Sequence, residues 1–189
     1  PVGDGLVHKV FKAVVEDGDM NTRTVLDENI VDGCKNVLWE PGDVIGVALY
    51  DNVYQPFTSV LEAPSANGVF EGNVGQDVMY YAIYPYTENQ RMSSSLDVVI
   101  HMVQTYREDS FDRDVAPMIA MAEDGKCLHF QNLCGVFALQ LTGNDKIKSI
   151  RFQSLAGQKV SGECMVETDY GDYPILETTD RSEDYVILD

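Results

Sequence analysis

The sequence has few basic residues. It contains 13 Lys and Arg against 31 Asp and Glu, which gives the 189 residues a formal net charge of −18. A protein that binds nucleic acid draws much of its affinity from Lys and Arg side chains that displace phosphate counterions. A chain this acidic repels polyanions, so the composition excludes nucleic acid as a partner. Long apolar runs are also absent. A membrane-crossing helix needs a run of about 18 apolar residues, and the sequence contains none.

The motifs that carry most enzyme chemistry are absent too. There is no G-x-S-x-G nucleophile elbow and no phosphate-binding P-loop. The three histidines, His8, His101 and His129, are isolated from one another in the sequence. Carboxylates are abundant because the whole chain is acidic, so their number does not single out a catalytic pair. We therefore predict that the protein is not an enzyme and has no catalytic residues, no cofactor and no metal site.

One acidic stretch has the spacing of a calcium-binding loop. Asp17, Asp19, Asn21 and Glu28 fall at EF-hand ligand positions, but Thr22 stands where the sharp turn of that loop requires Gly. The residues just before Asp17 have the pattern of a strand rather than of an entering helix. An acidic loop in solvent is the better interpretation.

Cysteine is scarce, at four residues. The even number permits up to two disulfides, in three possible pairings, and no C-x-x-C pair indicates zinc. Cys134 and Cys164 lie in apolar, strand-like runs, where small buried thiols are common. We favour free thiols, and the pairing of Cys34 and Cys127 stays open with the rest.

The sequence does contain a repeated alternation of apolar and polar residues, which is the period of strands with one buried face. The alternation is clearest in residues 96–101, 134–142, 147–155 and 160–167. Turn residues separate these runs, and polar stretches at 87–95 and 105–114 predict loops. We predict roughly ten to thirteen short strands, little or no helix, and a single antiparallel β domain over residues 1–189, either a sandwich or a barrel.

Several segments follow one another in a recognisable order. The chain reads Thr22-Arg23-Thr24, then Trp39-Glu40-Pro41-Gly42-Asp43, then Tyr80-Tyr81-Ala82-Ile83-Tyr84-Pro85-Tyr86, then Leu128–Gly135, then Val160-Ser161-Gly162. Over residues 22–162 this order resembles the N-terminal domain of the Bacteroidetes fimbrillins, the subunits of type V pili and their surface-lipoprotein relatives. The resemblance implies an all-β, transthyretin-like antiparallel sandwich, a place on the cell surface at the outer membrane, and a second β domain. Because the chain ends at Asp189, we expect that second domain to be missing from it.

The resemblance also implies a mode of assembly. In that family a protease removes the first strand after a basic residue, and an extended segment of another pilin subunit fills the groove by β-strand addition. Here the first strand would carry Val7, Phe11, Ala13 and Val15 on one face. The processing site would be Arg23, in the linker after that strand. The partners implied are other pilin subunits and a ligand on a host or bacterial surface.

A second interpretation is a surface glycan-binding module without catalysis. Tyr80, Tyr81, Tyr84 and Tyr86 cluster around Pro85, and exposed tyrosine rings can stack on sugars. Tyr84 and Tyr86 are the predicted contacts. The alternative is that two of the four tyrosines pack in the core and two lie at its rim.

Overall fold

The computed structural model describes residues 5–15, 26–31, 34–108, 110–167 and 174–189, with the backbone alone for 26–37. Fifteen strands and no helix occur in these residues, so the all-β prediction is confirmed for them. No helix long and apolar enough to cross a membrane is found in these ranges. The strands are β1 (Leu6–Val15), β2 (Leu26–Val31), β3 (Cys34–Val37), β4 (Val44–Ala48), β5 (Gln55–Ser59), β6 (Gly68–Gly75), β7 (Tyr80–Tyr84), β8 (Ser95–Ile100), β9 (Val103–Gln104), β10 (Met118–Ala122), β11 (Cys127–Asn132), β12 (Ile150–Gln153), β13 (Ser161–Glu167), β14 (Ile175–Glu183) and β15 (Tyr185–Leu188).

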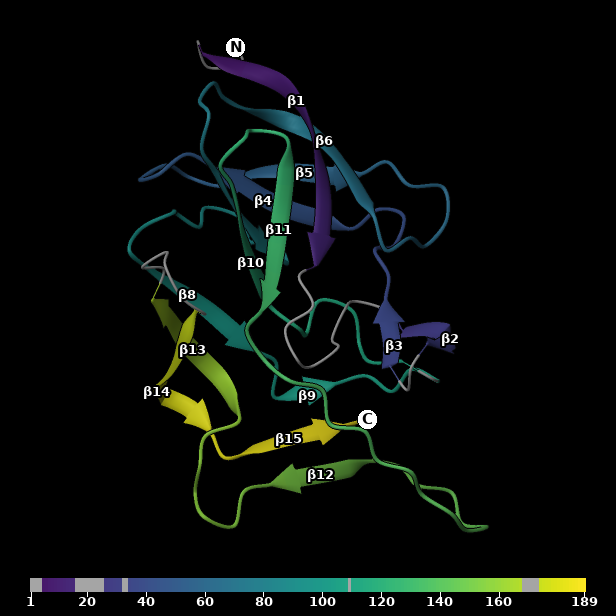
Figure 1. The fold of residues 1–189 in the computed structure, drawn as a ribbon. Coiled ribbons are helices and arrows are strands. Elements are labelled where there is room, and N and C mark those ends of the chain that lie inside the picture. Colours follow the sequence, from purple (N-terminus) through teal and green to yellow (C-terminus); the bar gives the residue numbers. More distant parts are fainter. Residues whose placement is uncertain (1–4, 16–25, 32–33, 109, 168–173) are drawn as a thin grey trace.

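Seven strands close into a barrel in the order β1-β11-β10-β7-β4-β5-β6 (Figure 1). Alternate side chains of these strands point inward, because successive residues of a strand face opposite sides of the sheet. They form an aromatic-rich core in which the Trp39 ring lies 5.0 Å from that of Phe70 and 5.2 Å from that of Phe130. Trp39, the only tryptophan of the chain, is 2% exposed and anchors this core.

A second layer covers one outer face of the barrel. The three-stranded sheet β14-β13-β8 contributes Leu96, Val98 and Val166 to a second core, where they meet Tyr81 and Ile83 from the outer face of β7. Strand β7 is consequently buried on both faces. The predicted sandwich is not confirmed, because the largest sheet of the described fold is a closed barrel with small sheets beside it. Two smaller sheets, β12-β15-β9 and β2-β3, complete the described fold.

The prediction of purely antiparallel pairing is wrong at two places. Strand β1 runs parallel to β11, and β15 runs parallel to β9. Parallel neighbours require a long connection between them, and most of the chain separates β1 from β11. Alternation within a run carries no information about the direction of a distant partner.

The predicted strand over residues 134–142 is also wrong. Residues 135–149 form no strand, and each of them is exposed. The other alternating runs overlap β8, β12 and β13, and the described residues of the predicted loops at 87–95 and 105–114 contain only the first residue of β8 as strand.

Candidate functional site: the strand that closes the barrel

Strand β1 completes the barrel by lying between β6 and β11. It pairs with β6 in antiparallel register over eight positions, from Leu6 opposite Gly75 to Ala13 opposite Gly68. It pairs with β11 in parallel register over four positions, from Lys12 opposite Cys127 to Val15 opposite Phe130. Figure 1 shows β1 crossing the upper half of the molecule between these two strands. Its removal would leave two open strand edges facing one groove.

The inward face of β1 is the face predicted from the sequence. Phe11 and Ala13 are completely buried, and Val7 and Val15 are half-buried on the same side. The Phe11 ring lies 5.6 Å from the ring of Phe57 on β5 and 5.1 Å from the ring of Tyr80 on β7. One side chain of β1 therefore contacts the far walls of the barrel, and it makes the strand part of the core.

Lys9 shares the inward face, although the sequence pattern does not single it out. Its Nζ lies 4.2 Å from the centre of the Tyr80 ring and 5.8 Å from that of Phe11. The aliphatic stem covers apolar surface near the end of the barrel while the ammonium sits over an aromatic face. Lys12 is exposed, as its opposite parity predicts.

Two glycines on β6 make room for the aromatic residues inside the barrel. A Cβ on Gly72, which pairs with Lys9, would lie 2.7 Å from the Phe57 ring. A Cβ on Gly68 would lie 2.8 Å from the Trp39 ring. A side chain at Gly72 would displace the Phe57 ring, against which Phe11 packs. A side chain at Gly68 would displace the Trp39 ring, which lies in the same core. The glycines thus shape the groove that receives β1.

The predicted processing site, Arg23, lies outside the described residues, as do Asp17, Asp19 and Asn21 of the calcium-like stretch. Within the described ranges, no cluster of His, Cys, Asp and Glu side chains has an arrangement that could hold a metal ion.

The prediction that Tyr84 contacts a glycan is contradicted by its burial. Tyr84 is 0% exposed, and its ring packs 5.5 Å from that of Trp39. Its hydroxyl donates a hydrogen bond of 2.8 Å to the Asp114 carboxylate, and burial raises the pKa of that hydroxyl. Tyr80 and Tyr81 are buried as well, because β7 is covered on both faces, and only Tyr86 remains half-exposed. Three of the four tyrosines therefore build core while Tyr86 lies at its rim, and no stacking platform forms from them.

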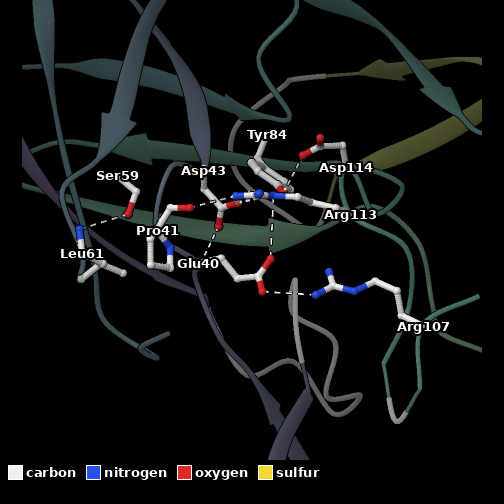
Figure 2. Close-up of polar contacts among 9 residues, drawn as sticks. All are labelled: Glu40, Pro41, Asp43, Ser59, Leu61, Tyr84, Arg107, Arg113 and Asp114. Atoms are coloured by element: carbon white, nitrogen blue, oxygen red, sulfur yellow. Dashed lines mark hydrogen bonds and ion pairs between the residues drawn. The ribbon is translucent and has the colours of Figure 1, made fainter. Parts of the chain in front are cut away.

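A polar cluster beside the barrel was not predicted from the sequence (Figure 2). The Asp43 side chain, just before β4, is completely buried and accepts a hydrogen bond of 3.0 Å from Nε of Arg113. The backbone amide of Glu40 donates to the other Asp43 oxygen at 2.7 Å. The Glu40 carboxylate in turn accepts a hydrogen bond of 3.3 Å from Nη2 of Arg107. Both arginines come from the loop at 105–114, so the cluster fastens that loop to the start of β4.

Burial and the neighbouring groups shift the pKa of Asp43 in opposite directions. Loss of water raises the pKa of Asp43, and the backbone hydrogen bond from Glu40 and the Arg113 guanidinium oppose that shift without cancelling it. The pKa of Arg113 is raised by its bond to Asp43. The sequence held one usable signal, an Asp directly after the Pro41-Gly42 turn, but nothing local identified its partner. The arrangement suits a structural clasp, since each charged group is already paired with one of opposite charge.

The cysteines with described side chains are free thiols. Cys164 is buried, while Cys127 and Cys134 are half-buried. Burial raises the pKa of all three, to about 11 for Cys134. Because the thiolate is the reactive form, we expect Cys134 and Cys164 in the native protein at pH 8 to react with a disulfide reagent much more slowly than in urea. Mass spectrometry of timed reactions measures this, and equal rates in both conditions would contradict it.

No known family model matches the chain, and neither the curated proteins nor the solved structures include one similar to it.

Proposed function

We propose that this chain is a structural or adhesive subunit of cell-surface fimbriae that assembles by strand exchange after removal of its first strand. The observation that carries the proposal is the position of β1, an N-terminal strand that alone closes the barrel between β6 and β11. An incoming strand could replace its twelve ladder positions with main-chain hydrogen bonds and fill the Phe11 site with a side chain.

The order of motifs that resembles the fimbrillins supports the same function. It adds to the proposal a transthyretin-like sandwich as the underlying fold, an outer-membrane surface location, other pilin subunits as partners and the absence of catalysis. The glycan-binding alternative loses its main support with the burial of Tyr84.

The test is cleavage with an arginine-specific protease followed by sizing. We expect one early cut at Arg23, loss of β1 from the folded remainder, and association of the cut chain. An Arg23→Gln variant is the matched control and should stay uncut and keep β1. A cut chain that remains monomeric with β1 still bound would remove the support for strand exchange.

Strand replacement can be measured directly with a labelled peptide of residues 6–15. The cut chain should bind this peptide, whereas the uncut Arg23→Gln chain should not, because its own β1 occupies the groove. A Phe11→Asp peptide should bind at least about a hundredfold more weakly, since it would bury an unpaired charge in the aromatic site. Equal affinities of the two peptides would show that the Phe11 side chain does not contribute to binding in the groove.

A further inference from the structure

A segment beyond β11 exposes an unusual amount of apolar surface. We call residues 135–160 the arm; it comprises the irregular residues 135–149, β12, and the turn that leads to β13. Its large hydrophobic side chains are mostly in water, with Phe137 68% exposed and Leu139 53% exposed. Seven such residues lie on it: Val136, Phe137, Leu139, Leu141, Ile147, Phe152 and Leu155. Single exposed apolar residues are ordinary, but a contiguous set marks an interaction surface.

The arm differs from the rest of the chain in charge as well. It carries Lys146, Lys148, Arg151 and Lys159 against a single acidic residue, Asp145, a net charge of +3. Because the whole chain carries −18, the remaining residues carry −21. The arm is therefore a cationic, apolar segment on an otherwise strongly acidic protein.

The irregular part of the arm has little cover from the described chain. Within the described ranges, residues 135–149 pair with no strand, and β12 pairs only with β15. Phe137 meets Phe152, 5.0 Å between ring centres, so the one aromatic contact of the irregular stretch is to the arm itself. In Figure 1 the irregular part of the arm extends to the lower right, whereas β12 runs back across the bottom toward the turn that leads to β13.

A groove with the complementary chemistry is formed outside the arm. It has a volume of about 740 Å³ and runs between the loop at 85–90 and strands β8, β13 and β14. Its lining combines apolar residues such as Ile83 with the carboxylates of Glu88, Asp97, Glu163 and Asp180. Glu163 is engaged by Arg181 at 3.0 Å, whereas the other three carboxylates have no cationic partner in the described chain.

One residue of the groove carries a buried atom without a partner in the described chain. Gln90 lines the groove, and its Oε1 is buried without a hydrogen-bond donor among the described residues. The groove thus offers acceptors, negative charge and apolar wall, which are what a cationic, apolar segment requires.

We infer that the arm of one copy docks in the acidic groove of a second copy, which gives a head-to-tail contact between uncut chains. The contact joins two different surfaces of the chain, so it is heterologous. The inference rests on the proposed function only in that both make copies of the chain associate. It uses neither β1 nor its groove.

The test uses the full chain carrying Arg23→Gln, so that strand exchange cannot contribute. Sedimentation velocity should show association that increases with protein concentration and weakens as NaCl is raised, because opposite charges meet. Lys148→Glu in the arm should weaken the association by about tenfold or more. Lys126→Glu is the matched control, an exposed lysine outside the arm that changes the net charge equally.

A charge swap identifies the partner surface. Asp180→Lys in the groove should also weaken association, and a chain carrying both Asp180→Lys and Lys148→Glu should regain it. All these residues are exposed, so the variants should keep the native Trp39 emission. Rescue by the swap supports the contact, and a double variant as weak as the single ones would overturn the groove as the docking site.

Other results would overturn the inference altogether. A monomeric Arg23→Gln chain at all concentrations would do so, as would arm-dependent binding to vesicles of anionic phospholipid without self-association. Neither result would affect strand exchange, which is measured on the cut chain and its peptide. Conversely, a cut chain that takes up no strand leaves the arm contact in place, so the two ideas fail separately.

Discussion

Replacing Phe11 with Ala should lower the free energy of unfolding by about 3–5 kcal/mol. The ring is completely buried and contacts Phe57 and Tyr80 across the barrel. Its loss removes apolar burial and leaves a cavity that a closed barrel cannot easily collapse, because the surrounding strands are fixed by their ladders. Urea unfolding followed by the emission of Trp39, which is buried in the same core, measures the change.

The matched control is Val10→Ala, next to Phe11 on the opposite face of β1. Val10 is 54% exposed, so this variant should lose less than about 1 kcal/mol, mainly through lower strand propensity. Phe11→Leu, which keeps most of the volume, should fall between the two. If Val10→Ala and Phe11→Ala cost the same, β1 does not hold the barrel closed through its inward face.

The strands that could be predicted are those with one face in water. In β8, Leu96 and Val98 are buried while Asp97 is exposed, and in β1, Phe11 is buried while Lys12 is exposed. Such alternation is a local property, since neighbouring side chains point to opposite faces. It gave the inward residues of β1 correctly, without any knowledge of the partner strands.

The features that were missed depend on distant parts of the chain. The clasp joins Asp43 to Arg113, 70 residues later, and neither residue stands out among the many charges of the sequence. Tyr84 looked like a surface aromatic because nothing local showed that its ring would lie inside a closed barrel, against Trp39. Phe137 and Leu139 have the alternation of a buried strand, but no part of the described chain covers them.

The second large effect is expected at the clasp, where Arg113→Ala should cost about 2–3 kcal/mol at pH 7. Removing one partner of a buried ion pair leaves a charge without compensation, which costs roughly 3–5 kcal/mol when both partners are inside. The Asp43 side chain is completely buried, but that of Arg113 keeps 38% of its exposure, so solvent screening reduces the penalty. Arg91→Ala is the surface control: its pair with Asp51 is exposed on both sides and should contribute less than about 1 kcal/mol.

The penalty should also depend on pH, in a direction set by Asp43. Its pKa in the folded protein is raised above 3.8, so the folded state holds the proton more tightly than the unfolded chain does. The resulting stabilisation is complete below the unfolded pKa and is lost as the pH rises through the folded pKa. Without Arg113 the pKa of Asp43 rises further, because the guanidinium opposes the effect of burial. The variant therefore loses more stability than the native protein as the pH rises, and the difference between them shrinks in acid.

Urea unfolding of both proteins between pH 4 and pH 8 tests this, with Asp43→Asn/Arg113→Ala as the decisive control. The neutral amide cannot ionise, so the difference between that double variant and Asp43→Asn alone should be nearly independent of pH. If the Arg113→Ala penalty stayed constant across the range, the guanidinium would be acting by packing against the turn at Pro41 rather than by neutralising Asp43. A penalty that grows toward neutral pH, and that disappears with the carboxylate, would show that the loop at 105–114 is held to the barrel by the buried charge.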